Sequence, residues 1–356
     1  MMKGEMNGIV PYMVALILSL GIVCVAHPYL VRFALRKRIV DNPNARKLNR
    51  VPIPVLGGVG VFFGFAVALY SVAAVADILL PNAYIVVLLL MLGVGLIDDL
   101  CDLKPKTKFA IQILTVLLLY FVCDLRIDNL HGIFGLHEIP MALSLPLTLV
   151  ACVGLINSLN LIDGVDGLSS GFGIVASVLF AAWTCVLGDC VNLLMSCALI
   201  GALIPFFIYN VFGKQNKMFM GDAGSHLLGV IFCVMALNVM VASPCDVKVE
   251  ATLIPFTFAV LSHPIMDTLR VMTMRIFRGN SPFKADKTHL HHALVGRGLT
   301  HLETTLIIIL LNLLVVLSWF VCYKCGVSAT CQMVIVVVVA VMCIIVPYPL
   351  LLRDKE

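Results

Sequence analysis

Two adjacent carboxylates, Asp98 and Asp99, close the segment GVGLIDDL at the end of a long apolar run. Neighbouring like charges repel each other unless a cation offsets them, and acidic side chains do not complement the C-terminal end of a helix. A hard divalent cation would offset them, because Mg²⁺ binds proteins through one or two carboxylates together with substrate phosphates. The pair therefore indicates metal-assisted phosphate chemistry, with a solvated helix end as the alternative.

Two further segments combine carboxylates with glycines. NSLNLIDGVDGLSSG, residues 157–171, contains Asp163 and Asp166, and MFMGDAGS, residues 218–225, contains Asp222. Glycine lets the backbone approach a ligand closely, although an ordinary Asp-Gly turn is the alternative for the first segment. Both segments therefore supply candidate ligand-binding carboxylates.

A basic loop, RIFRGNSPFKADKTHLHH at residues 275–292, ends in His289, His291 and His292. Histidine is the commonest metal ligand, but the surrounding residues lack the spacing of a structural zinc site. Arginine and lysine suit phosphate oxygens, so we favour a multiply charged phosphate as the ligand, with a loop that attracts anionic lipid as the alternative. Together the segments predict phosphoryl transfer between a soluble nucleotide compound and a lipid.

The composition predicts that membrane-spanning helices position these segments. The 356 residues are 61% hydrophobic and 12% charged, whereas a soluble domain is about one quarter charged. Apolar runs of about 20 residues are typical of spanning helices, and we read the N-terminal run as a span rather than a signal peptide. The predicted spans lie near residues 9–31, 55–77, 82–98, 109–125, 141–157, 171–188, 193–211, 225–243, 251–269, 303–323 and 329–351. The predicted fold is an all-α polytopic integral membrane protein with ten to eleven transmembrane helices.

Lysine and arginine are distributed very unevenly between the two sides of this topology. Of the 24 such residues, 20 fall in one set of connections and the C-terminal tail, and that set is predicted to be cytoplasmic because basic loops stay inside. The N-terminus is then outside and the C-terminus cytoplasmic. We expect a single transmembrane catalytic domain over residues 1–356, with its active site on the cytoplasmic face. Its predicted active-site loops lie near residues 32–54, 98–108, 157–170, 211–224 and 270–302.

Intramembrane carboxylates also mark ion paths, which leaves a membrane transporter as the non-enzyme alternative. A transporter typically has broken helices in two repeated halves, and the sequence lacks that pattern. The DGxDG pattern also occurs in the CDP-alcohol phosphotransferases, but those enzymes need a following Ala-Arg where this chain has LSSG. An enzyme of a different membrane phosphotransferase class is therefore favoured.

The ordered motifs resemble those of the bacterial polyprenyl-phosphate N-acetylhexosamine-1-phosphate transferases, of the glycosyltransferase family 4 type. The likeness runs over residues 41–302, from DNPNARKLNRVPIPVLGGVG through the aspartate pair, NSLNLIDGVDGL and MFMGDAGS to SPFKADKTHLHH. It implies a multi-pass enzyme of the bacterial inner membrane that transfers a sugar 1-phosphate from a UDP-sugar to undecaprenyl phosphate and releases UMP. The implied cofactor is Mg²⁺, with Mn²⁺ as a substitute. The implied partners are the UDP-sugar, undecaprenyl phosphate and the lipid bilayer; no nucleic acid is expected, and a homodimer is left open.

The resemblance also implies roles for individual residues. Asp222 looks like the Mg²⁺ ligand, and Asp98 and Asp99 look like the pair beside the metal that handles the lipid phosphate, where metal ligation by either is left open. Phe219 matches the position that stacks on uracil. The predicted substrate-binding residues are Lys47, Lys106, Lys108, Asn157, Asn160, Asp163, Asp166, Asn210, Phe219, Arg275, His289, His291 and His292.

The form of the histidine motif bears on the choice of sugar. HLHH at residues 289–292 resembles the branch that uses UDP-N-acetylglucosamine, whereas the branch that carries the muramoyl-pentapeptide precursor has three consecutive histidines. Asn49 stands where the family often has histidine, which puts a proton-transfer role at that position in doubt. N-acetylglucosamine is the expected sugar, with another UDP-N-acetylhexosamine or the muramoyl-pentapeptide precursor as alternatives. The product would prime synthesis of a cell-envelope glycan whose identity is left open.

Overall fold

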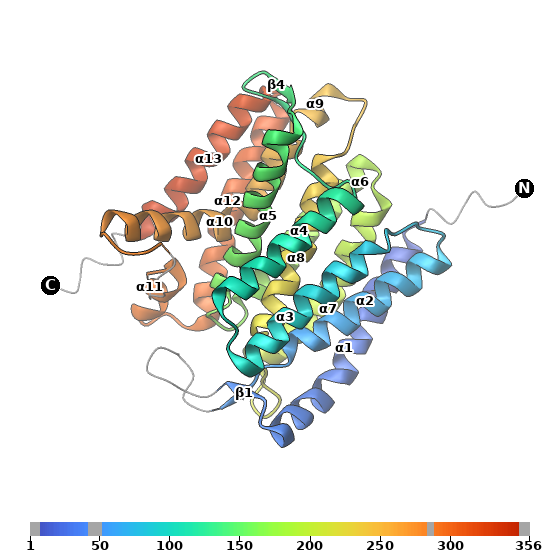
Figure 1. Ribbon diagram of the computed structural model, residues 1–356, viewed down its shortest axis with the longest axis vertical. Helices are drawn as coiled ribbons and strands as arrows, with labels where there is room; N and C mark the ends of the chain where they lie inside the picture. The colour runs from blue at the N-terminus through green and yellow to red at the C-terminus, as the bar shows by residue number, and fades with distance from the viewer. Residues whose placement is uncertain (1–7, 42–51, 283–287, 349–356) are drawn as a thin grey trace, which may run out of the picture. The chain divides into compact units, whose positions relative to one another are not determined.

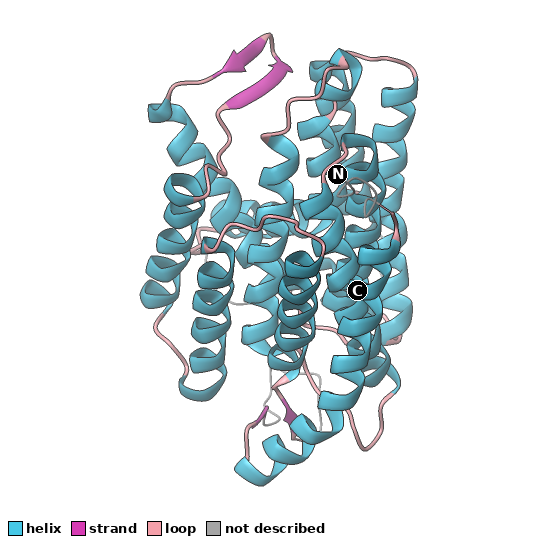
Figure 2. Ribbon diagram, turned by 90° about the vertical axis from the view of Figure 1, so that its right-hand side faces the viewer, coloured by secondary structure: helices cyan, strands magenta, loops and turns pink. Residues whose placement is uncertain are grey.

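The computed structural model describes residues 8–41, 52–282 and 288–348, and these residues are almost entirely helical (Figures 1 and 2). The elements in chain order are α1 (Val10–Lys37), β1 (Val40–Asp41), β2 (Ile53–Pro54), α2 (Gly57–Val75), α3 (Ala83–Cys101), α4 (Pro105–Val122), β3 (Asn129–Ile133), β4 (Leu136–Glu138), α5 (Met141–Ile162), α6 (Leu168–Leu187), α7 (Cys190–Phe212), α8 (Gly221–Met240), α9 (Val247–Glu250), α10 (Leu253–Phe277), α11 (Leu290–Gly296), α12 (His301–Lys324) and α13 (Ala329–Ile345). Strand β1 pairs antiparallel with β2, and β3 with β4.

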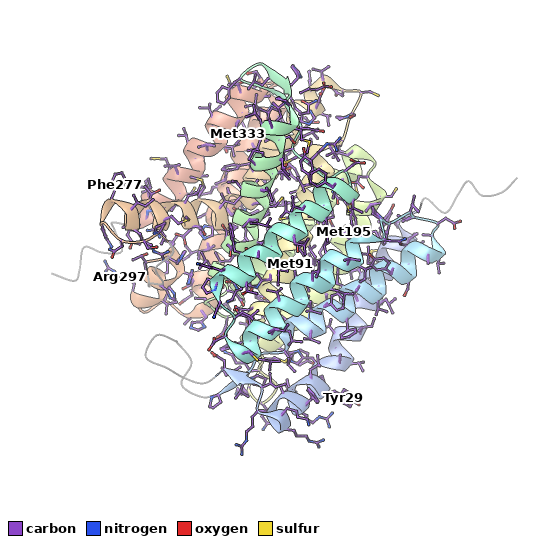
Figure 3. All side chains as sticks on the ribbon, viewed as in Figure 1. Tyr29, Met91, Met195, Phe277, Arg297 and Met333 are labelled. Atoms are coloured by element: carbon purple, nitrogen blue, oxygen red, sulfur yellow. The ribbon has the colours of Figure 1, made fainter. Side chains whose placement is uncertain are left out.

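Ten helical segments of the described chain are long and apolar enough to cross a membrane, and α13 is a shorter apolar helix of 17 residues. Apolar side chains are exposed along these helices; the labelled Tyr29 and Phe277, which are 63% and 85% exposed, point away from their helices (Figure 3). A surface rich in exposed apolar groups suits a lipid environment. The prediction of an all-α protein with ten to eleven spans is therefore confirmed, and this is a multi-pass membrane protein. The orientation of its termini stays a prediction.

The chain forms two compact units, each assembled from two separate segments. Unit 1 comprises Met1–Asp124 and Ser169–Met235, and unit 2 comprises Leu125–Leu168 and Ala236–Glu356. Each unit carries some of the predicted site residues. The single catalytic domain predicted from the sequence stays a prediction.

In unit 1, α1, α2 and α7 pack on one another, and α3 packs on α4 and α2. The part of α8 that belongs to this unit is buried on every side: Leu227, Val230, Ile231, Phe232 and Cys233 are at most 1% exposed. A helix that is apolar all round lies in a protein core or in a membrane, and the low exposure of these residues shows that protein covers α8. Met91 of α3 and Met195 of α7, labelled in Figure 3, are also buried, at 0% and 1% exposed. The surrounding helices therefore fix α8, whose first turn carries Asp222.

In unit 2, α10, α12 and α13 pack together, while α5 packs on α10 and α11 on α12. Pro264 within α10 has no N–H, so the carbonyl of Val260 one turn earlier loses its helical donor. Nδ2 of Asn312 on α12 donates to that carbonyl at 3.0 Å, and Oδ1 of Asn312 accepts from the His263 N–H at 3.0 Å. One buried amide thus joins α12 to α10 where α10 lacks its own hydrogen bond.

Candidate active site

Asp99 holds the beginning of α8 in unit 1. Its Oδ1 accepts the backbone N–H of Asp222 at 2.8 Å and its Oδ2 accepts that of Ala223 at 3.0 Å. The first N–H groups of a helix have no partner within the helix, so a carboxylate from α3 caps α8. Gly95, one turn before Asp99, makes this approach possible, because a Cβ there would lie under 3.0 Å from backbone atoms of Ala223 and Asp222. The contact fixes the position of Asp222.

Asp98 makes different contacts from its neighbour. It is buried, and its Oδ1 accepts the N–H of Leu103 at 2.8 Å. Its Oδ2 forms an ion pair with Nζ of Lys108 on α4, and the same Nζ lies 3.6 Å from Oδ2 of Asp222. Two carboxylates from α3 and α8 therefore converge on one ammonium group. We call Asp98, Asp99, Asp222 and Lys108 the aspartate cluster.

The aspartate cluster meets the requirements of a Mg²⁺ site completed by a substrate. No group of three or more His, Cys, Asp or Glu side chains is arranged to hold a metal ion among residues 8–41, 52–282 and 288–348. Mg²⁺ keeps several waters and usually takes one or two carboxylates plus substrate phosphates. The oxygens of Asp98 and Asp222 that face one cationic group are such a pair, so these residues fit the ion.

The loop between α7 and α8 is held at several points in unit 1. The Phe219 N–H donates to the carbonyl of Pro54 at 2.8 Å, and the Phe219 carbonyl accepts from the Gly57 N–H at 3.0 Å. Nδ2 of Asn210 donates to the carbonyl of Met218 at 2.9 Å. Asn210 therefore positions the loop that presents the half-buried Phe219 ring, and Lys217 Nζ lies 5.9 Å from the centre of that ring.

In unit 2, the end of α5 and the following turn carry the amide and carboxylate residues of the first glycine-rich segment. Asn157 Nδ2 donates to the Val153 carbonyl at 2.7 Å, and Asp163 is the C-cap of α5. Oδ2 of Asp166 lies 2.6 Å from Nδ1 of His301, the first residue of α12. This contact joins the turn to α12.

The three histidines of HLHH lie at the start of α11. His289 and His291 are buried, and their rings are nearly parallel at a centroid distance of 5.6 Å. The ring of His292 lies 4.3 Å from that of His291. Gly164 of the glycine-rich turn faces His291, because a Cβ on Gly164 would lie 2.8 Å from Nε2. The turn and the histidines, which are distant in sequence, are therefore neighbours in unit 2.

A buried carboxylate on α10, Asp267, holds this histidine segment. Its Oδ2 lies 2.8 Å from Nδ1 of His289, and its Oδ1 accepts from Nη2 of Arg270 at 2.7 Å. Arg275, also buried at the end of α10, donates from Nη1 to the carbonyl of Pro282 at 2.7 Å. We call Asp267, Arg270 and His289 the histidine clamp.

The predicted site residues thus fall into two groups. Unit 1 brings together Asp98, Asp99, Lys108 and Asp222, with Phe219 and Asn210 on the neighbouring loop; Lys106 is exposed in the first turn of α4. Unit 2 brings the turn at residues 163–167 to the histidines. Lys47 and Asn49 lie outside the described residues. The substrate-binding roles assigned from the sequence stay predictions.

Sequence reasoning missed several residues that support these groups, including Asp267, Arg270, His301 and His27. His27 of α1 stacks on Tyr209 and has Nε2 2.8 Å from the carbonyl of Asn216, so it also holds the α7–α8 loop. Asp267 stands inside the predicted apolar span 251–269, and Arg270 follows directly after it. Charged residues in such spans are costly and mark functional positions, so this pair could have been recognised from its position alone.

The histidine segment gives unit 2 a testable pH dependence. Burial lowers the pKa of His291 well below its ordinary value of 6.5, and the charge of nearby His292 lowers it further. Below pH 6.5, His291 therefore binds a proton in the unfolded chain but stays neutral in the folded one. We expect the free energy of unfolding to be unaffected by this group above that pH and to fall by up to about 1.4 kcal/mol per pH unit below it.

Thermal unfolding of the purified protein in detergent, followed from about pH 8 to about pH 5, measures this dependence. His291→Gln, which cannot be protonated, should flatten the acid limb of the stability curve. An equally steep acid limb in that variant would assign the dependence to other groups.

Comparison with known proteins identifies the family of this chain. The family model for glycosyl transferase family 4 matches residues 82–240. A probable undecaprenyl-phosphate N-acetylglucosaminyl 1-phosphate transferase from Bacillus subtilis is 31% identical over 311 residues, which cover 86% of this chain and 83% of that protein. Undecaprenyl-phosphate α-N-acetylglucosaminyl 1-phosphate transferases from Salmonella typhi and Escherichia coli K12 are 30% and 29% identical, over 78% of this chain and 75% of each relative.

The matched family region contains the aspartate cluster and the glycine-rich turn, whereas the histidines at residues 289–292 lie beyond it. The relatives extend the match over most of the chain. The chain therefore belongs to glycosyl transferase family 4 and is a polyprenyl-phosphate sugar-1-phosphate transferase.

Proposed function

We propose that this enzyme transfers N-acetylglucosamine 1-phosphate from UDP-N-acetylglucosamine to undecaprenyl phosphate, releases UMP and depends on Mg²⁺. The convergence of Asp98 and Asp222 on Lys108 carries the proposal, because it combines carboxylates for a hard cation with a cation for a phosphate. The names of the relatives supply the sugar and the lipid. The proposed location is the bacterial inner membrane with the active site on the cytoplasmic face, and the product would prime a cell-envelope glycan.

The proposed reaction is a direct displacement at phosphorus. An oxygen of undecaprenyl phosphate attacks the β-phosphorus of the UDP-sugar, the bond from the β-phosphorus to the bridging oxygen breaks, and UMP leaves with that oxygen. A phosphate monoester has a second pKa near ~6, so the attacking group is already mostly dianionic at neutral pH. A strong general base is not required. Catalysis then consists mainly of positioning and charge stabilisation, as in other phosphoryl transfers.

The residues of the aspartate cluster have separate tasks in this proposal. Asp222 and Asp98 would hold Mg²⁺, which supplies charge stabilisation to the diphosphate when bound. Lys108 presents its ammonium group to a phosphate oxygen, a role that suits lysine as a compact point charge. Asp99 keeps Asp222 in place through the first turn of α8. A two-step route through an aspartyl phosphate is the alternative, and stereochemical retention at a chiral β-phosphorus would favour it over direct attack.

Phe219 is proposed to stack on the uracil ring. Loss of an aromatic platform costs about 1–3 kcal/mol for a stacked base, so Phe219→Ala should raise the KM for the UDP-sugar by about 10- to 100-fold with a smaller change in kcat. Phe219→Tyr should keep a KM close to that of the unaltered enzyme. Steady-state UMP release at varied donor concentration measures both.

Phe212→Ala is the matched control, because Phe212 ends α7 just before the same loop and is 59% exposed. Equal KM changes in the Phe219 and Phe212 variants would show that the α7–α8 region responds to any loss of an aromatic ring, and would remove uracil stacking from the proposal.

Purified enzyme with undecaprenyl phosphate, Mg²⁺ and radiolabelled UDP-N-acetylglucosamine tests the whole proposal. The expected products are a butanol-soluble labelled lipid and UMP in equal amounts, with loss of both on chelation of the metal. UDP-N-acetylgalactosamine and the muramoyl-pentapeptide precursor serve as competing donors, and faster turnover of either would replace the proposed sugar. Family membership favours the enzyme over the transporter alternative.

A further inference from the structure

We propose that Asp267 is a positioning residue that fixes the tautomer of His289 and leaves Nε2 of that ring as the atom that meets a phosphate oxygen of the nucleotide sugar. The inference rests on the proposed function and on the prediction from sequence that the histidines of HLHH bind the substrate. The juxtaposition of α10 and α11 in unit 2 carries it.

Both carboxylate oxygens of Asp267 have hydrogen-bond partners, although the residue lies in an apolar helix. The side chain is 0% exposed. Oδ1 accepts from Nε and Nη2 of Arg270 at 3.2 and 2.7 Å, Oδ2 lies 2.8 Å from Nδ1 of His289, and both oxygens are within 3.3 Å of the Leu290 N–H. Arg270 also donates from Nη2 to the carbonyl of Thr288 at 2.6 Å. A buried charge persists only when it is paired and hydrogen-bonded, and Asp267 meets that condition through the residues that begin α11.

The contact between Oδ2 of Asp267 and Nδ1 of His289 determines which ring nitrogen carries the proton. An ionised carboxylate can only accept hydrogen bonds, so Nδ1 of His289 must carry the proton that Oδ2 accepts. Nε2 is therefore the nitrogen that is free to change partner. Within the described part of the chain, Nε2 of His289 is buried and has no hydrogen-bond partner, and leaving such a group unpaired costs about 1–3 kcal/mol. A ligand oxygen would remove that cost.

The charges in the histidine clamp favour an anionic ligand. Asp267 and Arg270 neutralise each other, so a proton on Nε2 makes the three side chains cationic in sum. An imidazolium N–H donates a charge-assisted hydrogen bond to a phosphate oxygen, which is stronger than a neutral one. The carboxylate opposite Nδ1 fixes the orientation of the ring. Asp267 thus prepares His289 as a donor to the diphosphate without touching the substrate itself.

Asp267 also caps α11 through the Leu290 N–H, and a purely structural role must be separated from the proposed one. Asp267→Asn achieves this separation. The amide oxygen can keep Arg270 and the Leu290 N–H, while the amide nitrogen takes the place of Oδ2 and donates to Nδ1 of His289. The cap is retained, but the proton of a neutral His289 moves to Nε2, and Nδ1 no longer donates to a charged oxygen.

The test combines kinetics with nitrogen NMR of histidine-labelled full-length protein. Loss of a group that orients a functional histidine lowers activity by about 10- to 100-fold, and we expect that decrease in kcat/KM for UDP-N-acetylglucosamine in Asp267→Asn. His289→Gln should lose a similar factor, and the double variant should lose no more than His289→Gln alone. The ¹⁵N spectrum of the unaltered chain should show a protonated Nδ1 for His289, which shifts to a protonated Nε2 in Asp267→Asn.

Asp246→Asn is the control, because Asp246 caps α9 in unit 2 and asparagine caps a helix equally well. Normal kcat/KM in Asp267→Asn, a full additional loss in the double variant, or a neutral His289 with its single proton on Nε2 in the unaltered chain would each overturn the inference. The last measurement decides even where Asp267→Asn fails to fold. Unchanged kinetics in His289→Gln would remove His289 from donor binding and would also overturn the inference, whereas absence of labelled lipid with the unaltered enzyme would be a failure of the proposed function.

Discussion

Asp222→Asn is expected to lower the rate of UMP release by about 1,000-fold while the protein still accumulates in the membrane. The factor is typical for removal of a charge that stabilises a phosphoryl-transfer transition state. Accumulation should persist because the substitution keeps the backbone N–H of residue 222, which is the group that Asp99 accepts. An amide of nearly the same shape keeps that backbone contact and removes only the charge that faces Lys108. The residual activity should also require a higher Mg²⁺ concentration for half-maximal rate.

Asp189→Asn is the matched control for this experiment. Asp189 is the N-cap of α7 in the same unit, and its side chain accepts the Asn192 N–H at 3.0 Å. Asparagine is as good an N-cap as aspartate, so the control should keep both activity and abundance. Near-normal UMP release by Asp222→Asn, with an unchanged Mg²⁺ requirement, would exclude Asp222 as a metal ligand.

The spans could be predicted from the sequence because a bilayer imposes a simple rule. A spanning helix must satisfy its own backbone hydrogen bonds and needs about 20 apolar residues, and ten of the described helical segments meet that rule where apolar runs occur. The charge pair at Asp98 and Asp99 was likewise recognisable, because carboxylates at the end of an apolar run are costly unless they have a function.

The division of tasks within each motif could not be read from the sequence. Asp98 and Asp99 are adjacent and chemically identical, yet one forms an ion pair with α4 and the other caps α8. Asp267 likewise caps α11 from α10. These contacts depend on which helices are neighbours, and no local pattern encodes that. Asn210 is predicted to bind substrate; in the structure its Nδ2 donates to the Met218 carbonyl, and the substrate-binding role stays a prediction.

Although the two residues are neighbours, Asp98→Asn should therefore lower mainly kcat, and Asp99→Asn should lower mainly the unfolding temperature. Asp98→Asn keeps an oxygen for the Leu103 N–H and loses the charge that pairs with Lys108. We expect a loss of about 100- to 1,000-fold in kcat, as for other groups that stabilise developing charge, with little change in the unfolding temperature.

Asp99→Asn should instead destabilise the protein. Its amide can accept only one of the two N–H groups at the start of α8 and turns a donor toward the other. Leaving one buried N–H unpaired costs about 1–3 kcal/mol, and the loss of a negative charge at a helix N-terminus adds about 0.3–1 kcal/mol. Activity should fall with the same variant because Asp222 loses its support, and it should recover in part when the temperature is lowered.

Thermal unfolding and UMP release measured on the same preparations distinguish the two roles. A lower unfolding temperature for Asp99→Asn with a near-normal one for Asp98→Asn is the expected pattern. Equal stability with equal loss of kcat would place both carboxylates on the substrate, as the family resemblance implies for the pair, and would reduce the cap on α8 to a secondary contact. A lower unfolding temperature for Asp99→Asn than for Asp98→Asn would thus show that Asp98 is a ligand and that Asp99 supports α8. No difference would show that both are ligands.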